Sequence, residues 1–457
     1  MALDILSEIS RALADIMAPH GPVVAGVKTM APADYSIHLF LQLAAIILSC
    51  RVVGWLGQKF LGQSQVVGEM IAGVILGPSL LGLLFPDFQL VLFPVATKNV
   101  LYAGAQLGVG FYMFLVGTTL RIDHFQSKAK SAFGVSLAGI VTPFIIAAII
   151  TPLLLPIPGL FAEGISQSNA TLFMGACIAL TAFPMLARII NERGLADTSL
   201  GTLSLTAGAF DDACSWCVLA IVLATFGAGP GVAIVAIGGG LLYATFILTI
   251  GPKLLAPLGR MVEEKGELST GLFAIVVMLF CLSAFLMDAI GIHAVFGGFL
   301  LGVALPRGKL TQEIRKKAEP LTVVLLLPMF FTYSGLNTRM DMLTSVPLLL
   351  IALGILVASI LAKFGACWAA ARIAGEDNRT ALGIGALMNS RGLMELIIIN
   401  IGLQKGVIGP TLFSMMVLMA IVTTMMAGPL FEIVYGRKAR QSGELAELKG
   451  AMVAEAA

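Results

Sequence analysis

The segment 202–226 reads TLSLTAGAFDDACSWCVLAIVLATF, and its only charged residues are Asp211 and Asp212. It has the length of a membrane-spanning α-helix, which needs about 20 apolar residues. A charged side chain at the centre of a bilayer costs about 2.5–3.5 kcal/mol on insertion scales, so such residues indicate a function. The segment therefore predicts a spanning helix that carries a functional site.

The composition of the whole chain agrees with a membrane protein. The chain has 457 residues, of which 58% are hydrophobic and 12% charged, with a mean hydropathy of +0.96. A soluble domain carries about 25% charged residues, because its surface faces water. The net charge of +2 and the lack of a basic run interleaved with aromatics exclude nucleic acid as an expected partner.

The cysteines and the N-terminus add two expectations. All six cysteines lie in apolar runs, which is typical of helix-packing residues rather than of a disulfide framework. Cys214 and Cys217 form a C-x-x-C in mid-helix without a βαβ pattern, which does not favour a redox site. Apolar residues at helical spacing between Ile5 and Ile16 predict an amphipathic surface helix and no signal peptide.

We predict an all-α membrane protein with thirteen spans. They cover residues 36–53, 66–84, 99–120, 132–155, 170–191, 202–226, 231–252, 271–287, 291–306, 321–336, 346–371, 380–403 and 410–435. This divides the chain into an N-terminal amphipathic segment (1–35), a transmembrane domain (36–435) and a short cytoplasmic tail (436–457). No separate soluble domain is expected.

The distribution of Lys and Arg orients these spans. With thirteen spans, the loops on one side hold 21 Lys and Arg residues and the other side holds 5. Cytoplasmic loops carry the positive excess, so the N-terminus is predicted outside and the C-terminus inside. Fusing the short spans 271–287 and 291–306 would move a loop with five positive charges to the outside, which argues for two separate spans.

Two basic residues, Lys363 and Arg391, lie inside predicted spans. At a rise of 1.5 Å per residue, Asp211 and Asp212 lie roughly 3–5 Å from mid-span, and Lys363 lies about 6 Å away on the same side. Pairing is therefore plausible, since either charge alone in hydrocarbon would be costly. A purely structural bridge or a snorkelling lysine is the alternative, although such a bridge would not need the second acid.

Two spans at this depth contain helix breakers. The fifth span contains Thr181-Ala182-Phe183-Pro184, and the twelfth contains Asn389-Ser390-Arg391 before Gly392. Non-helical backbone at membrane depth occurs where it is buried in protein or lines a cavity. The offset of seven spans gives opposite topology, which is typical of an inverted repeat with its site at the midplane, although Pro184 alone could be a simple kink. Arg391 and Glu395 are four residues apart and can pair locally, with a structural and a functional role both open.

Five motifs in order resemble the cation:proton antiporter-2 family. They are VGEMIAGVILGPS (67–79), FLVG (114–117) followed by Asp123, TAFPMLAR (181–188), GIHAVFG (291–297) and MNSRGLMEL (388–396). The last three are similar to the plant cation/H⁺ exchanger branch. Glu69 and His293 fall within these motifs near span ends, where we expect structural or interfacial roles.

The resemblance implies an antiporter fold with two crossed, discontinuous helices at spans five and twelve. It implies a mobile core of spans 4–6 and 11–13, a scaffold that forms a homodimer, and a bacterial inner membrane location. Asp212 matches the family's ion and proton carrier, while Asp211 and Lys363 match the pair of electrogenic members. The plant-like branch usually has Asn at the position of Asp211. No regulatory nucleotide-binding domain is expected.

The sequence therefore leads to one main hypothesis and two rivals. In the main hypothesis Asp212 alternately binds H⁺ and Na⁺ or K⁺, with Thr181 or Asn389 completing an oxygen shell. An intramembrane aspartyl protease would need two acids facing each other, which consecutive residues on one helix do not favour. A proton-uncoupled channel would show rings of acids or carbonyl filters, which are not evident. We expect no enzymatic activity and no cofactor.

Overall fold

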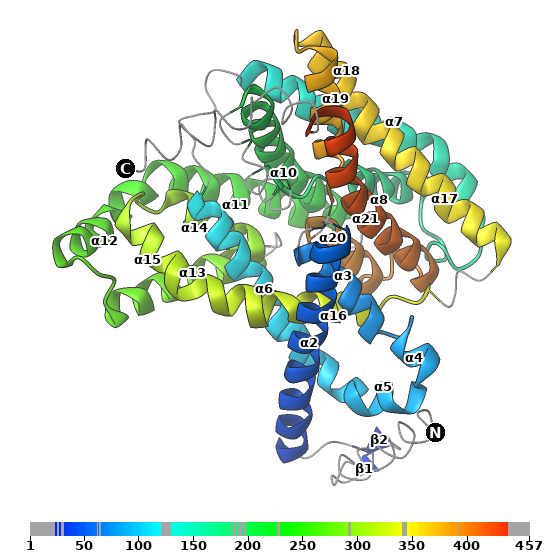
Figure 1. Cartoon of the computed structure of the whole chain (residues 1–457), viewed down its shortest axis with the longest axis horizontal. Helices are drawn as coiled ribbons and strands as arrows, with labels where there is room; N and C mark the ends of the chain where they lie inside the picture. Colours follow the sequence, from blue (N-terminus) through cyan, green and yellow to red (C-terminus); the bar gives the residue numbers. More distant parts are fainter. Residues whose placement is uncertain are drawn as a thin grey trace. The chain divides into compact units, whose positions relative to one another are not determined.

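The computed structural model describes residues 23–24, 27–28, 32–61, 63, 65–119, 129–183, 186, 189–190, 195, 198–225, 229–290, 294–340, 345–391 and 393–436. This part of the chain is almost entirely helical (Figure 1). Strands β1 (Val23–Val24) and β2 (Val27–Lys28), each of two residues, pair in antiparallel orientation. The helix predicted between Ile5 and Ile16 lies outside the described residues.

The helices of the first half are α2 (Pro32–Leu61), α3 (Gln65–Leu76), α4 (Leu81–Leu84), α5 (Pro86–Leu92), the 3₁₀ turn η1 (Val95–Thr97), α6 (Lys98–Thr119), α7 (Ala129–Leu154), α8 (Gln167–Ala179), α10 (Ser199–Thr225) and α11 (Gly229–Thr249). The second half contains α12 (Gly251–Lys265), α13 (Thr270–Ala289), α14 (Ala294–Ala304), α15 (Lys309–Leu321), α16 (Leu327–Leu336), α17 (Val346–Ile360), α18 (Ala366–Ile373), α19 (Asn378–Met388), α20 (Leu393–Gln404) and α21 (Pro410–Phe431). Three π-helical segments, η3 (Thr322–Leu326), η5 (Leu361–Gly365) and η6 (Glu432–Gly436), continue neighbouring α-helices.

Many of these helices can cross a bilayer. In the described residues, eight helices are long and apolar enough to do so, or nine if the bent pair formed by α11 and α12 counts as one span. The predicted all-helical membrane architecture is therefore confirmed. The prediction of thirteen spans is not confirmed by this count, in which helices such as α8, α19 and α20 are too short to cross a bilayer.

Several boundaries differ from the predicted ones, among them the end of the first span and the linkers after residues 252 and 306, where α12 and α15 lie. The first span was predicted to end at residue 53, but α2 continues to Leu61. Lys59 lies in the last turn of this helix, and its Nζ lies 4.6 Å from the centre of the Trp55 ring, whose face attracts the cation. The linker predicted after residue 252 is the helix α12, which buries Leu255 and Val262 and exposes its charged residues.

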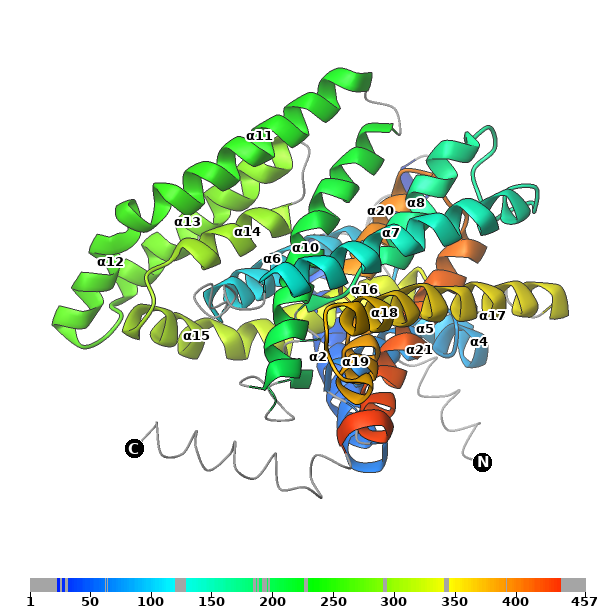
Figure 2. The ribbon, with the colours of Figure 1, turned by 90° about the horizontal axis from the view of Figure 1, so that it is seen from above.

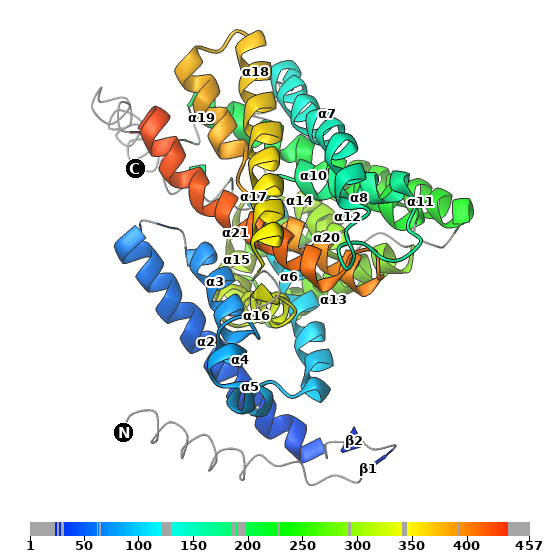
Figure 3. The ribbon, with the colours of Figure 1, turned by 90° about the vertical axis from the view of Figure 1, so that its right-hand side faces the viewer.

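The chain divides into two compact units. Unit 1 comprises Met1–Thr118, Gly251–Ala284 and Gly297–Thr344. Within it α2, α3 and α16 lie side by side (Figures 1 and 3). Gly73 lets α3 touch α16, because a Cβ there would overlap the Phe331 carbonyl, and such close approach is how helices associate in membranes. One buried apolar cluster of unit 1 consists of Ile46, Cys50, Ala72, Leu76, Leu92, Phe93, Leu101, Met329 and Leu336.

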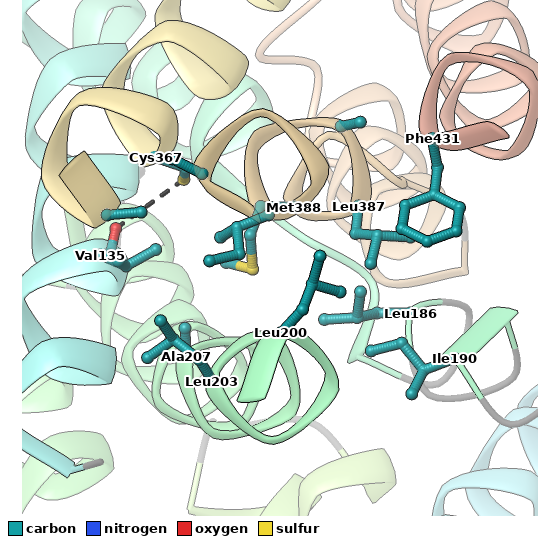
Figure 4. Packing of buried hydrophobic residues seen from close by; sticks show 14 of the residues in the cluster. Val135, Leu186, Ile190, Leu200, Leu203, Ala207, Cys367, Leu387, Met388 and Phe431 are labelled. Carbon is teal, nitrogen blue, oxygen red and sulfur yellow. Dashed lines mark hydrogen bonds between the residues drawn. The ribbon is translucent and has the colours of Figure 1, made fainter. Parts of the chain in front are cut away.

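Unit 2 comprises Thr119–Ile250, Phe285–Phe296 and Ser345–Ala457. Within it α7 runs alongside α17 and α18 (Figures 1 and 2). Figure 4 shows Leu200 and Leu203 of α10 packed near Leu387 and Met388 of α19. These residues belong to one buried apolar cluster that also includes residues of α7, α18 and α21. The cluster therefore fixes α10 and α19 against each other just before the helix break that follows Met388.

Candidate functional site

Asp211 of α10 forms a buried ion pair with Lys363 of η5. Both side chains are fully buried, and Lys363 Nζ lies 2.9 Å from Oδ1 and 3.0 Å from Oδ2 of Asp211. Lys363 also donates to the carbonyls of Gly139, at 3.0 Å, and of Ala179. Thr181 N–H donates to Asp211 Oδ2 at 2.8 Å. The contact expected from the depths of Asp211 and Lys363 is thus present in the structure.

Local backbone geometry brings Lys363 to this position. It lies in the π-helical segment η5, and single π-turns within α-helices are frequent at functional sites. On the facing helix α7, Gly139 leaves room for the lysine, because a Cβ at that residue would lie 3.3 Å from Lys363 Nζ and 2.8 Å from Cys367 Sγ. A larger residue at 139 would therefore displace the amine.

The first helix break follows α8. Ser166 caps the start of α8, its side chain accepting from Asn169 N–H, and the helix ends at Ala179. Leu180 is extended, with φ −69° and ψ 134°. The sequence explains this end, because a proline clashes with the carbonyl four residues earlier, and Leu180 is four residues before Pro184. Pro184 itself lies outside the described residues.

The second break follows α19, and it contacts the first. Met388 ends α19, and α20 begins at Leu393. Across the breaks, Ala182 N–H donates to the Ser390 carbonyl at 3.1 Å, and Thr181 Oγ1 donates to the Met388 carbonyl at 2.8 Å. The two interruptions predicted from the sequence therefore meet at one place, beside the Asp211–Lys363 pair.

The residues after the second break are fastened to α21 (Pro410–Phe431). Arg391 N–H donates to Thr424 Oγ1 at 3.2 Å, and that hydroxyl lies 2.8 Å from the Arg391 carbonyl. These contacts satisfy backbone groups that a continuous helix would have paired internally, as buried backbone requires. Thr424 thus stabilises the interruption in place of helical hydrogen bonds.

Arg391 and Lys363 bind the buried carbonyl end of α8. Arg391 donates through Nη1 to the Cys177 carbonyl at 2.9 Å and through Nη2 to the Ile178 carbonyl at 2.8 Å. Lys363 donates to the next carbonyl, that of Ala179. The C-terminus of a helix carries a partial negative charge, so positive side chains stabilise it there. Three consecutive carbonyls of α8 are therefore paired with the two cations of the site.

Arg391 has two further partners, Glu395 and Ser359. Arg391 Nη1 lies 3.3 Å from Glu395 Oε1, and Nη2 donates to Ser359 Oγ at 2.8 Å. Arg391 is fully buried and Glu395 is 1% exposed. The local ion pair expected from their spacing of four residues is present. Asp211, Lys363, Arg391 and Glu395 together bring two positive and two negative charges into one buried region of unit 2.

Several buried polar atoms beside the breaks have no hydrogen-bond partner within the described part of the chain. Both amide atoms of Asn389 and the hydroxyl of Ser390 are of this kind. Asn389 is 1% exposed and Ser390 is fully buried. Amide and hydroxyl oxygens are ligands that hard cations prefer. The region therefore offers oxygen atoms that no described residue uses in a hydrogen bond.

The other predicted site residues stand as follows. Asp212 lies on α10 next to Asp211, but its side chain is outside what the structure describes. Phe183 is buried, and His293 lies outside the described residues. Glu69 is buried in α3 of unit 1, where Gln65 Nε2 donates to its Oε1 at 3.2 Å. It belongs to a different unit from Asp211.

Sequence reasoning missed Gly139, Ser359 and Thr424. Ser359 carried a signal, since it precedes Lys363 by four residues on the same helix, where side chains share a face. Gly139 and Thr424 carried none, because small and weakly polar residues are common in spanning helices. Their roles depend on contacts with distant segments.

Comparison with known proteins identifies the family of this chain. The family model for the transmembrane part of sodium/hydrogen exchangers matches residues 45–435. The Na⁺/H⁺ antiporter NhaS4 of Synechocystis sp. is 40% identical over 413 residues, which cover 87% of this chain and 98% of that protein. Cation/H⁺ antiporter 17 of Arabidopsis thaliana is 35% identical over 423 residues, covering 88% of this chain and 49% of that protein. The chain thus spans about half the length of the plant relative.

A solved structure has the same fold. The sodium proton antiporter MjNhaP1 from Methanocaldococcus jannaschii matches with a TM-score of 0.57, covering 90% of this chain and 98% of that chain. At 18% identity this match concerns the fold alone. The resemblance to cation:proton antiporters inferred from the five motifs is confirmed, and the protein is a multi-pass integral membrane protein. The chain belongs to the sodium/hydrogen exchanger family.

Proposed function

We propose that this protein is a secondary active antiporter that exchanges a monovalent cation, Na⁺ or K⁺, for H⁺ by alternating access. Membership of the sodium/hydrogen exchanger family supports this activity. The observation that carries the proposal is the buried Asp211–Lys363 pair beside two helix breaks that hydrogen-bond to each other. Ionisable groups at membrane depth mark ion or proton pathways, and broken helices supply the ends that bind ions.

In this mechanism Asp212 carries the transported ions. Its carboxylate binds either a proton or a cation from which water has been removed, and the two compete for the same oxygens. This competition alone couples the two fluxes. The site binds either a proton or a cation at a time, so it carries one in each direction across the membrane. Adjacent side chains on a helix point about 100° apart. The two acids of α10 therefore face different surroundings and can have separate roles.

Asp211 and Lys363 have the second task. Their contact holds the positive end of Lys363 beside the exchange site, and Thr181 N–H supports the carboxylate. When a cation approaches, Asp211 is free to exchange partners only if Lys363 moves or loses its proton, which links the pair to the transport cycle. If Lys363 releases its proton to water when the cation binds, two protons leave the site for each cation, one from Asp212 and one from Lys363, and the exchange is then electrogenic.

The oxygen shell of the cation comes from the breaks. Thr181 Oγ1 donates its proton to the Met388 carbonyl, which leaves its lone pairs available as acceptors. Asn389 and Ser390 supply further oxygens, which have no hydrogen-bond partner among the described residues. Hard monovalent cations favour such neutral oxygens together with one carboxylate.

We further propose thirteen spans, with the N-terminus outside and the C-terminus inside, and crossed discontinuous helices at spans five and twelve. The charge asymmetry of the loops supports the orientation. The contact between residues 181–182 and 388–390 supports the crossing. Spans 4–6 and 11–13 form the moving core, the remaining spans form the scaffold of a homodimer, and the membrane is the bacterial plasma membrane.

Proteoliposomes that report internal pH test the proposal. Addition of Na⁺ or K⁺ to the wild-type protein should drive proton movement, and using the two cations in turn reports which one is transported. Asp212→Asn should abolish this movement, because the amide cannot hold a proton for exchange. Asp87→Asn, on an exposed position of α5, is the matched control and should exchange as the wild type does. Exchange retained in Asp212→Asn would refute the assignment.

A further inference from the structure

The Arg391–Glu395 pair has features that a purely structural ion pair lacks. Glu395 is 1% exposed, and only its Oε1 contacts Arg391, at 3.3 Å. Its second oxygen, Oε2, has no hydrogen-bond partner within the described residues, and neither does Arg391 Nε. A buried ionised carboxylate normally accepts hydrogen bonds at both oxygens, because each unsatisfied oxygen costs free energy. Glu395 therefore keeps an acceptor position that a proton can occupy.

Among the described residues, few titratable or charged groups surround Glu395. Among the elements packed against α20 (Leu393–Gln404), α21 has no titratable side chain. From α8 the Cys177 thiol lies within electrostatic reach, and from η5 Lys363 does so. Arg391 at the break completes the set, with Asp211 paired behind Lys363. Arg391 therefore balances the charge of Glu395 directly, and Lys363, which is paired with Asp211, lies within electrostatic reach of it.

These two cations connect Glu395 to Asp211. Arg391 pairs with the carbonyls of Cys177 and Ile178, and Lys363 pairs with the next carbonyl, that of Ala179. Arg391 also binds Ser359, one helical turn before Lys363 on the same rod of α17 and η5. Three consecutive carbonyls of α8 therefore connect Arg391, the partner of Glu395, to Lys363, the partner of Asp211. A change of charge at Glu395 alters the electrostatic environment of the Asp211–Lys363 pair through these contacts.

We propose that Glu395 is a second proton-binding residue, and that its protonation weakens cation binding at the exchange site through Arg391. The step is a reversible transfer of one proton from water to Glu395 Oε2, which turns a carboxylate into a neutral acid and breaks no other covalent bond. Arg391 keeps its charge, so the buried region gains one net positive charge. The inference rests on the proposed cation/H⁺ exchange.

The sign of the effect follows from charge. With Glu395 ionised, the positive charge of Arg391 is balanced, and a cation can enter beside α8. With Glu395 protonated, the unbalanced guanidinium repels a second cation in a region of low dielectric constant. Acid pH therefore lowers cation affinity twice, by competition at Asp212 and by protonation of Glu395.

Glu395→Gln imitates the protonated state at every pH. At alkaline pH we expect its KM for the cation to be about tenfold higher than that of the wild type, and at acid pH the two values should converge. Glu69→Gln, a buried glutamate of α3 outside the site, is the matched control and should keep the wild-type pH profile. A Glu395→Gln profile that superimposes on the wild type would overturn the coupling.

Infrared difference spectra between acid and alkaline pH test the proton site without transport. The band of protonated carboxylic acid should be smaller in Glu395→Gln than in the wild type, because only the contribution of Asp212 remains there. Asp212→Asn should retain the contribution of Glu395. If Glu395→Gln keeps the full band, the proton site is refuted even when exchange works. Should Glu395→Gln fail to fold, Glu395→Asp retains a carboxylate farther from Arg391, and an unchanged pH midpoint of its cation affinity would equally contradict the proposal.

Discussion

Asp211 and Lys363 stabilise the fold only as a pair. Both side chains are fully buried, so water screens neither charge. Removing one member of a buried pair leaves the other uncompensated, which costs about 3–5 kcal/mol. We expect Asp211→Asn and Lys363→Gln each to lower the stability of the purified protein by roughly this amount. The double variant should lose less than the sum of both, because no isolated charge remains.

Thermal unfolding in detergent measures this coupling. The wild type, both single variants and the double variant form a double-mutant cycle, which isolates the pair's interaction free energy. Losses that simply add in the double variant would show that Asp211 and Lys363 act independently, against the contact in the structure.

At the scale of residues, charge in an apolar segment was enough to predict the two buried ion pairs of the candidate site. Asp211, Lys363, Arg391 and Glu395 were identified because each is costly in hydrocarbon, and depth along the helices predicted which could meet. The partners of these charges are main-chain carbonyls and small hydroxyls, such as Ser359. Every residue has a carbonyl, so no sequence pattern distinguishes the three carbonyls of α8 that accept hydrogen bonds from Arg391 and Lys363.

Among the elements, α19 depends on its N-cap. Asp377 Oδ2 accepts from Arg379 N–H at 2.9 Å and from Thr380 N–H at 3.2 Å. The hydrogen bonds from Thr380 and the neighbouring N–H of Arg379 lower the pKa of Asp377 below its ordinary value. Folding therefore favours the carboxylate. The resulting stabilisation is present above about pH 4 and is lost as the pH falls through the lower pKa of the folded state.

Asp377→Ala should accordingly destabilise the protein by about 1 kcal/mol at neutral pH. Because the carboxylate of the wild type is protonated in acid, the difference between the two proteins should shrink as the pH falls below about 4. Asp377→Asn retains a capping oxygen and is the control, with stability close to the wild type. Melting curves of the three proteins at several pH values provide the measurement, and a difference independent of pH would disagree with the lowered pKa.

Helices were predictable as elements, but their interruptions were predictable only in part. Pro184 predicted the end of α8 at the correct turn, since its ring excludes the carbonyl of Leu180 from a helix. The π-helical segment that contains Lys363 has no such marker, because LAKFG (361–365) is compatible with an ordinary helix. Amphipathic α12 was missed, because the charges that signalled a loop instead form the exposed face of a helix.

For the molecule as a whole, the sequence predicted helical class and family, while the number of crossings depends on how short helices are counted. Hydropathy and length identify eight or nine spans in the described residues, since broken and short helices such as α8, α14 and α20 fall below the length of a bilayer. The proposal of thirteen spans instead uses charge. It places the segment 307–320, which has five Lys and Arg residues and forms most of α15, in the cytoplasm.

This topology makes a prediction for two exposed positions. Lys316, whose side chain is 78% exposed, lies on α15 in the segment proposed to be cytoplasmic, and Glu163 lies in a loop proposed to face outside. In a variant whose six native cysteines are replaced, Glu163→Cys should react with a membrane-impermeant maleimide added to intact cells. Lys316→Cys should react only in inside-out vesicles. Labelling of both positions from the outside would mean that 271–306 crosses the bilayer once, because that is the arrangement in which the basic segment leaves the cytoplasm.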